Sequence, residues 1–315
     1  MRKTGMMMLT ALLAVSCQYK DLCYDHHHTG MVTLAYDWTD VQEASPAGMT
    51  ALFYGGAAAP VRYDFSGMQG GNANIPTGSW QAVSYNNDTE SVLYRGDGVE
   101  SLEAYTRKSS LEEGSKIQTQ NAMPMAKGTE GEAVILEPDL LWGGASQPFT
   151  VEDAGRQTIT IFPQELAAEV EVTICNVPNL QYISGIGGAM SGLAGSVFVA
   201  SGTVGAECVT QSFEVSVADA TTLKMHFRTF GHCPQADAGV VNTHVLTIYA
   251  VLADGTQWYY TEDVTTQMHE ASRYADPHHL ILELDGLPVP KPIVNGSGLQ
   301  PTVDGWQEVD IEVTM

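Results

Sequence analysis

Apolar and polar residues alternate with a period of two along most of this chain, in short runs that end at turn-forming residues. Examples of the turns are Gly70-Gly71-Asn72 and Asn86-Asn87-Asp88. Successive side chains of a β-strand point to opposite faces, so a period of two is typical of strands with one buried face. Gly, Asn and Asp favour the backbone conformations of tight turns. The pattern therefore predicts an all-β protein.

The expected strands fall into two series. The first series covers residues 31–38, 49–54, 80–85, 91–94 and 101–106. The second covers residues 157–162, 168–176, 196–200, 212–217, 222–229, 243–252, 257–264 and 279–284. Seven or more short strands at this spacing favour a sandwich. We place the boundary near 146–153, which predicts an N-terminal domain at 30–150 and a C-terminal domain at 151–286.

Two local features stand out in the second series. Asp254-Gly255 lies between two alternating runs, and Asp-Gly readily supplies the positive φ that a hairpin turn needs. The sequence therefore predicts a hairpin around residues 253–256. Residues 188–193 are expected to form a short helical turn between flanking glycines.

The N-terminus has the pattern of a secretory signal. Arg2 and Lys3 precede an apolar run at 6–15, which is about half as long as a bilayer-spanning helix. We interpret residues 1–16 as a cleaved signal peptide. Ala14 and Ser16 then precede Cys17 in an order that resembles a bacterial lipobox, which makes Cys17 the expected lipidation site. The alternative is an ordinary secreted protein with an incidental first cysteine.

Composition excludes some partners and leaves the disulfides open. Loss of Arg2 and Lys3 with the signal takes the formal net charge from −23 to −25, which repels nucleic acid. Export permits disulfides among the remaining cysteines. We expect one or two bridges, with Cys175–Cys208 as a pair, although sequence does not determine the connectivity of Cys23, Cys175, Cys208 and Cys233.

The C-terminus is expected to be a spacer followed by one last strand. Prolines alternate with other residues at 287–292, which fixes an extended conformation and removes hydrogen-bond donors. Beyond it, Val309, Ile311 and Val313 share one face of an alternating stretch. That stretch is either the last strand of its own domain, which we favour, or a strand donated to another subunit.

No catalytic or metal site is predicted. Histidines cluster at 26–28, at 278–279 and at His232 beside Cys233, but neighbouring residues on a strand point to opposite faces, so we expect no structural metal and no cofactor. HExxH, GxSxG, GxxxxGK[ST] and GxGxxG motifs do not occur. Candidate sugar-stacking residues have no platform spacing; they are Trp80, Trp142, Trp258 and Trp306.

Several segments resemble an uncharacterised family of Bacteroidetes cell-envelope lipoproteins. They include residues 21–26, 36–38, 86–90, 229–233, 258–260, 263–265 and 286–292. More distantly, the order of lipid anchor, two strand domains and extended tail is similar to the fimbrillin and fimbrial-anchor superfamily. That likeness implies two tandem transthyretin-like Greek-key sandwiches and assembly by strand donation.

One departure from the fimbrillin pattern bears on the role. Fimbrillins lose their first strand to a trypsin-like protease, yet between Lys20 and Arg62 this chain has no Lys or Arg. The chain is thus compatible with an anchor or accessory subunit that keeps its first strand. We expect a surface-exposed outer-membrane lipoprotein, with no enzymatic activity, that contacts pilus subunits through strand exchange. The alternative functions are a surface glycan-binding lipoprotein and a hydrolase with an unrecognised site.

Overall fold

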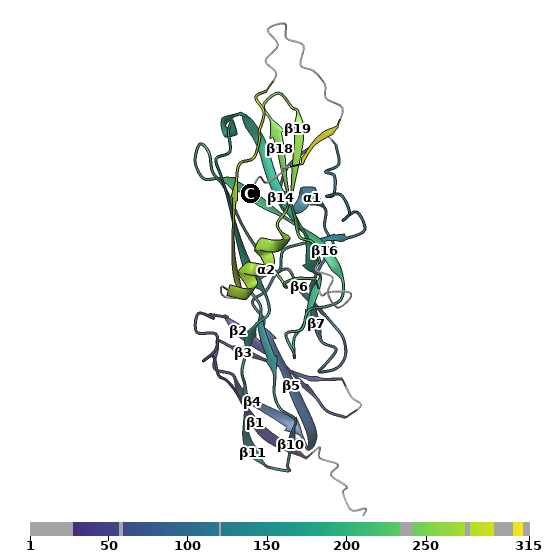
Figure 1. Cartoon of the computed structure of the whole chain (residues 1–315). Helices are drawn as coiled ribbons and strands as arrows, with labels where there is room; N and C mark the ends of the chain where they lie inside the picture. The colour runs from purple at the N-terminus through teal and green to yellow at the C-terminus, as the bar shows by residue number, and fades with distance from the viewer. Residues whose placement is uncertain are drawn as a thin grey trace, which may run out of the picture.

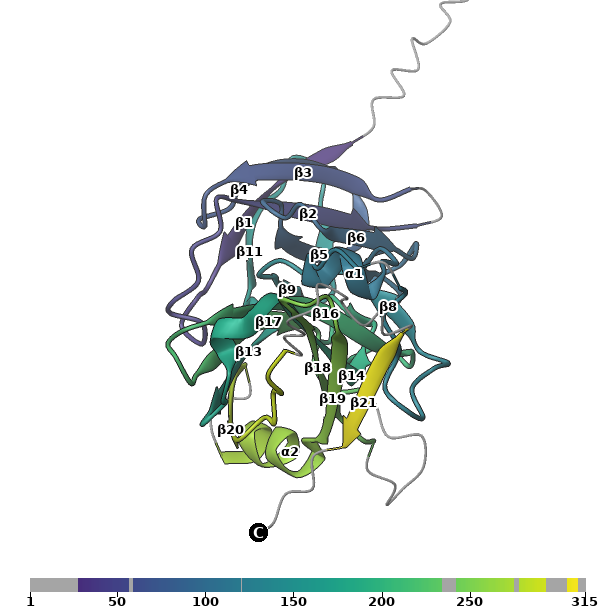
Figure 2. The same ribbon diagram turned by 90° about the horizontal axis from the view of Figure 1, so that it is seen from above.

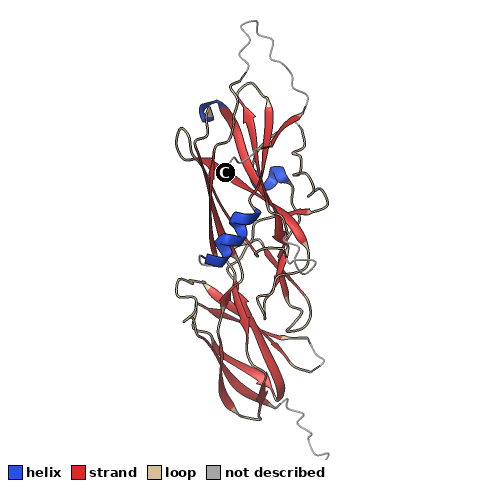
Figure 3. Ribbon diagram, viewed as in Figure 1, coloured by secondary structure: helices blue, strands red, loops and turns tan. Residues whose placement is uncertain are grey.

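Strands dominate the architecture, as Figure 3 shows. The computed structural model describes residues 28–56, 59–119, 121–233, 242–274, 278–292 and 305–310. Within these ranges the helical elements are α1 (Leu111–Ser115), α2 (Thr265–Tyr274) and a 3-10 turn at Leu180–Tyr182. The all-β prediction is confirmed. The molecule is elongated, with two strand-built halves stacked end to end (Figure 1).

The N-terminal half is a sandwich of two sheets. One sheet has the order β11-β1-β4, and the other has the order β12-β9-β5-β2-β3 with β10 beside β5. Its strands are β1 (Thr29–Tyr36), β2 (Gly48–Tyr54), β3 (Val61–Ser66), β4 (Gly71–Pro76), β5 (Gly78–Asn86), β9 (Trp142–Ala145), β10 (Phe149–Val151), β11 (Arg156–Ile161) and β12 (Gln164–Glu165). Alternation along β1 buries Val32 and Leu34 in a core shared with Phe53 and Ile161.

A small third sheet lies between the two halves. It has the order β15-β7-β6, and its strands are β6 (Val92–Arg95), β7 (Glu103–Thr106) and β15 (Ser196–Phe198). Its apolar residues form one cluster with residues of both halves, such as Val83 and Phe230. Burial of this cluster couples the two halves of the molecule.

The C-terminal half is one long sheet folded over itself. The order is β20-β13-β17-β16-β14-β18-β19-β21, with β8 (Ala133–Ile135) beside β16. The other strands are β13 (Ala168–Cys175), β14 (Ile183–Ala194), β16 (Cys208–Val217), β17 (Leu223–Thr229), β18 (Val245–Leu252), β19 (Gln257–Asp263), β20 (His279–Asp285) and β21 (Trp306–Asp310). β16 pairs with β14 in its first part and with β17 from Val215 onward, so it turns the corner between the two layers.

The interior between these two layers holds the largest apolar cluster. Phe213 and Phe227 stack face to face there with ring centroids 4.1 Å apart. Helix α2 lies between β20 and β19 when the molecule is seen from above (Figure 2). Its Met268 is fully buried in the same cluster. Met268 of α2 thus fills part of the space between the two layers.

The predicted hairpin is confirmed and the predicted helical turn is wrong. β18 and β19 pair antiparallel across residues 253–256, where Gly255 has a φ of 82°. Residues 188–193 instead belong to β14, which is hydrogen-bonded to β16 on one side and β18 on the other. The small residues permit close packing, because a Cβ at Gly188 would collide with the Phe213 ring. Gly192, with a φ of 74°, lies where the β14–β16 register shifts.

Strand pairing near the expected domain boundary does not follow chain order. β11 comes after that boundary and pairs in parallel with β1, whereas β8 precedes it and pairs with β16. Each half therefore contains segments from both sides of residue 150. The transthyretin-like and Greek-key descriptions stay predictions.

The proline-rich segment after β20 packs against the C-terminal half. Leu287 and Val289 are buried in its core, and the Asn179 Nδ2 group donates a 2.7 Å hydrogen bond to the Val289 carbonyl. Alternation here again points every second side chain inward. The start of the expected spacer is thus fixed to the domain that precedes it.

Candidate functional site

Three histidines that are distant in sequence meet in the C-terminal half. His232 follows β17, His244 immediately precedes β18, and His269 lies in the middle of α2. One ring nitrogen from each residue lies within 4.8 Å of those of the other two. His244 is completely buried, and the other two are partly buried. We call these three residues the histidine cluster.

The rings face one another at short range. His232 Nδ1 lies 3.0 Å from His244 Nε2, and the His232 and His269 rings are stacked with centroids 5.0 Å apart. The other His244 nitrogen, Nδ1, lies 3.3 Å from the Ser191 carbonyl oxygen. His269 Nε2 lies 3.5 Å from the Asn242 carbonyl oxygen. The His232 Nε2 atom is buried and has no hydrogen-bond partner among the described residues.

Burial disfavours the charged form of His232 and of His244. Desolvation, together with the nearby His269, lowers the pKa of His232 to about 4. Desolvation, together with His232, also lowers the pKa of His244 to about 4, although the Ser191 carbonyl opposes that shift. Neutral imidazole offers a nitrogen lone pair, which is the form that a metal ion requires.

The disulfide next to the histidine cluster corrects the expected pairing. Cys208 at the start of β16 is bonded to Cys233, with Cα atoms 5.1 Å apart, and Cys175 is free and exposed. The Cys175–Cys208 prediction is therefore wrong. Cys175 ends β13 on the exposed side of that strand, whereas the close approach of Cys233 to β16 depends on a loop that sequence spacing does not reveal.

The candidate strand at the C-terminus pairs within its own chain. β21 lies parallel to β19, with Val309 opposite Tyr260. Trp306 meets the Tyr249 ring edge-on, with centroids 5.5 Å apart. β21 thus covers an edge of the C-terminal sheet, beside β19 in Figure 2. Ile311 and Val313 lie outside the described residues.

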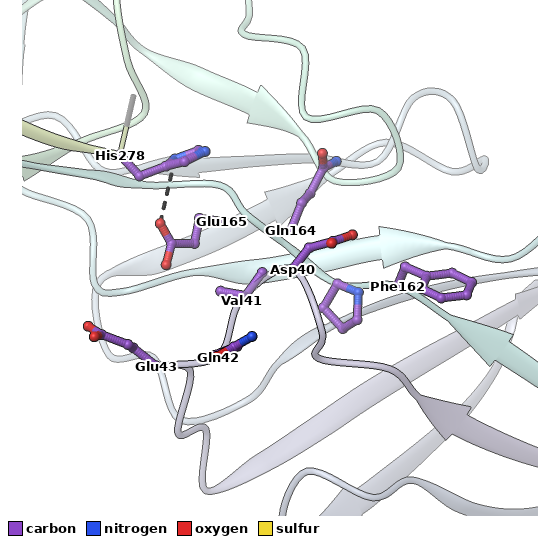
Figure 4. Close-up of a pocket in the computed structure, with 9 residues that line it drawn as sticks. Asp40, Val41, Gln42, Glu43, Phe162, Gln164, Glu165 and His278 are labelled. Carbon is purple, nitrogen blue, oxygen red and sulfur yellow. Dashed lines mark ion pairs between the residues drawn. The ribbon is translucent and has the colours of Figure 1, made fainter. Parts of the chain in front are cut away.

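An open hollow of about 450 Å³ lies at the junction of the two halves (Figure 4). It is lined from the loop after β1 by residues 40–43 and from the β11–β12 connection by Phe162, which is 59% exposed. His278 Nδ1 lies 3.8 Å from Glu165 Oε2 at one end of the hollow. Carboxylates beside an exposed ring make this a polar junction.

The other predicted residues are placed as follows. Cys17, His26 and His27 lie outside the described residues, and His28 Nδ1 contacts Asp153 Oδ2 at 2.8 Å on the surface. His279 lies 3.4 Å from Glu171 across neighbouring strands. Among the described histidines that the sequence analysis considered, His232 is the one that the structure brings into a cluster of three.

The tryptophans are packed against protein. Trp80 and Trp142 are buried in apolar clusters, and Trp258 and Trp306 pack on the C-terminal core. The Trp38 indole donates a 2.9 Å hydrogen bond to the Met68 carbonyl. A flat, exposed row of rings for stacking on sugars is therefore not formed by the described tryptophans.

Sequence comparison assigns the chain to a family. Residues 16–214, more than half of the chain, match the family described as "Domain of unknown function (DUF5119)". The chain belongs to the DUF5119 family. The family resemblance predicted from the sequence is thereby confirmed.

Relatives of this DUF5119 chain extend the comparison to its full length. A protein of Bacteroides ovatus named "Putative fimbrium anchoring subunit Fim4B" is 23% identical over 97% of this chain and 96% of the relative. A crystal structure from the same species, described as "a putative adhesin", covers 87% of this chain and 98% of that chain, with 20% identity and a TM-score of 0.58. The structure of the fimbrial anchor protein Mfa2 from Porphyromonas gingivalis is also similar. The match covers 82% of this chain and 90% of that chain, with 12% identity and a TM-score of 0.50.

The DUF5119 match does not reach every candidate site. It includes Cys17 and ends at residue 214 within β16, so the histidine cluster and β21 lie beyond it. No described helix of this DUF5119 protein is both long and apolar enough to cross a membrane.

Proposed function

We propose that this protein is a fimbrial anchor or accessory, adhesin-like subunit held at the outer membrane by a lipid on Cys17. The observation that carries the proposal is the end-to-end match to the relative named as a fimbrium anchoring subunit, over 97% of this chain and 96% of the relative. A match over both domains supports a shared role better than a match over one module would. The role is structural and not enzymatic.

The shape of the molecule supports attachment at one end. β1 begins at Thr29, at the end of the N-terminal half farthest from the C-terminal half (Figure 1). Thr29 is the twelfth residue after Cys17, so a lipid on Cys17 lies within about 40 Å of that end. The C-terminal half then projects away from the membrane toward its partners. Several acyl chains on one cysteine hold far more firmly than a single chain.

The edges of the C-terminal sheet supply the contact with other pilus subunits. β21 ends the sheet next to β19, and residues 293–304 connect it to the proline-rich segment. Edge strands present unpaired backbone groups that accept a strand from another chain. In our proposal, exchange at the β19 edge displaces β21, so a partner's strand replaces one that the chain itself supplies.

The proposal is tested in the bacterium that produces the protein. Wild-type cells and cells with Cys17→Ser are fractionated, and the protein is purified from detergent-solubilised envelopes with its bound partners. We expect the wild-type protein in the outer-membrane fraction together with pilus subunits. The Cys17→Ser protein leaves that fraction, and fimbriae are shed into the medium.

Cys175→Ser is the matched control, because Cys175 is an exposed thiol far along the chain from the leader. Cells with this change should fimbriate as the wild type does. Unchanged fimbriae in a strain without the protein, together with no pilus subunit in the purified complex, would contradict the proposed function.

A further inference from the structure

The histidine cluster is held by a rigid backbone frame. The Cys233 amide donates to the Gly192 carbonyl at 3.0 Å, and the Ala194 amide donates to the Gly231 carbonyl at 2.9 Å. Hydrogen bonds on both sides of His232 thus tie it to β14. The disulfide from Cys233 to β16 fixes the same loop a second time.

The other two histidines are fixed to the same end of the sandwich. The His244 amide donates to Thr265 Oγ1 at 2.8 Å, and the Val264 amide donates to the His244 carbonyl at 2.9 Å. His269 follows Met268, whose side chain is fully buried in the core. Helix α2 is therefore docked firmly enough to hold His269 against the other two rings, and the three side chains are positioned before any ligand arrives.

One pair of ring nitrogens in the histidine cluster has a separation close to that of two ligands in a metal centre. Zinc–nitrogen bonds of about 2.0–2.1 Å place the nitrogens of a tetrahedral site roughly 3.3 Å apart. His232 Nδ1 and His244 Nε2 are 3.0 Å apart, so one cation reaches both. His244 Nδ1 faces the Ser191 carbonyl, and a ligating histidine usually gives its second ring nitrogen to an acceptor of this kind.

The alternative to a metal is a histidine cluster held together only by hydrogen bonds. If His244 Nδ1–H donates to the Ser191 carbonyl, then His244 Nε2 accepts from His232 Nδ1–H. The buried His232 Nε2 is then a lone pair with no donor among the described residues. A cation between the two facing nitrogens replaces that proton and places the His232 hydrogen on Nε2, which has no acceptor among the described residues either, so the case for a metal rests on the spacing of the ring nitrogens.

We propose that His232, His244 and His269 form a binding site for a divalent transition-metal ion, with zinc as the fitting member of that class. Three imidazoles match zinc sites that keep a fourth position for water. The ion joins the loop after β17, the start of β18 and helix α2, three segments that are far apart in sequence. Its role is to fix this end of the C-terminal half. The proposal revises the expectation of no structural metal and is independent of the proposed function.

The test uses the chain from residue 18 to 315, which retains every described residue, without an affinity tag that contains histidine. His26, His27 and His28 are replaced by Gln in every sample, because adjacent histidines near the terminus bind zinc on their own. After removal of metal with a chelator, zinc chloride is titrated calorimetrically, and cobalt chloride is followed by its visible absorption. We expect one zinc per chain, a higher melting temperature with zinc, and a cobalt spectrum typical of tetrahedral coordination.

His269→Gln is the test variant, and His279→Gln is the matched control on an exposed strand position. We expect His269→Gln to weaken zinc binding at least tenfold and to lose the zinc-dependent rise in melting temperature, while His279→Gln behaves as the parent does. Near-ultraviolet circular dichroism without metal checks that both variants are folded. The proposal is overturned by the absence of stoichiometric zinc binding in the parent, or by equal zinc affinity in the parent and His269→Gln.

Discussion

Single residues decide how firmly the end of the C-terminal half is held. The Cys208–Cys233 bridge closes a loop with a sequence separation of 25 residues. Cross-linking a loop of this size removes conformational entropy from the unfolded chain. We expect the double change Cys208→Ala and Cys233→Ala to lower the free energy of unfolding by about 3 kcal/mol in urea titrations.

Cys175→Ala is the control for that experiment, because Cys175 is a free thiol on the surface. Its free energy of unfolding should match that of the parent within about 0.5 kcal/mol. A loss in Cys175→Ala equal to that in the double variant would show that Cys175, and not Cys233, is bonded to Cys208.

One carboxyl group makes stability depend on pH. Glu262 on β19 is partly buried, and desolvation raises its pKa from 4.5 to about 7. Between pH 4.5 and 7 the folded state therefore holds a proton that the unfolded state has released, so stability falls as pH rises through this window. Glu262→Gln removes the titration and should be more stable than the parent at pH 8 by about 1 kcal/mol or more.

The measurement is urea unfolding of the parent and Glu262→Gln at pH 5 and pH 8. The difference in free energy of unfolding between Glu262→Gln and the parent should be smaller at pH 5, because the parent carboxyl is mostly protonated in the folded state there. Glu308→Gln on neighbouring β21 is the control, because this residue is exposed. An equal difference in free energy of unfolding at both pH values would show that Glu262 does not make the stability depend on pH.

At the scale of elements, β21 determines whether the β19 edge is closed. Its Trp306 and Val309 pack on the C-terminal clusters, and its backbone pairs with β19 in parallel. A chain that ends at residue 304 should lose about 2 kcal/mol of stability, because this partly buried apolar area returns to water. Amide hydrogen exchange along β19 should accelerate, while exchange in β14 stays slow.

A chain that ends at residue 310 is the control for this truncation, since it keeps all of β21. It should melt as the full chain does. A chain ending at 304 with unchanged stability and unchanged β19 exchange would mean that β21 does not protect its own sheet, which would favour a strand held ready for donation.

Across the whole molecule, the sequence predicted local features well and distant contacts poorly. Alternation predicted many of the strands, although not β3 and β4, and Asp254-Gly255 predicted a turn, because both signals depend on neighbouring residues. The helical turn predicted at residues 188–193 was wrong, because the small residues there serve the packing of β14 between β16 and β18. The disulfide and the histidine cluster join segments up to 37 residues apart, from His232 to His269, and no short motif marks them.

The shape of the whole molecule sets which end faces the membrane. Thr29 accepts from the Ala154 amide at 3.0 Å, so the β10–β11 turn lies beside the start of β1. The β18–β19 turn lies in the other half, toward the opposite end (Figure 1). Anchorage through Cys17 therefore predicts that Glu152 is near the bilayer and that Ala253 is far from it.

Fluorescence energy transfer to a dye in the membrane measures how far residues 152 and 253 lie from the bilayer. The lipidated protein carries Cys23→Ser and Cys175→Ser, so that these thiols are not labelled. A fluorophore is attached at Glu152→Cys or at Ala253→Cys, both of which are exposed positions. The labelled protein is then placed in vesicles that contain an acceptor lipid. Transfer should be strong from position 152 and weak from position 253, because its efficiency falls steeply with distance. Equal transfer from both positions would mean that the molecule lies flat on the membrane, and an upright fimbrial anchor would then have to be abandoned.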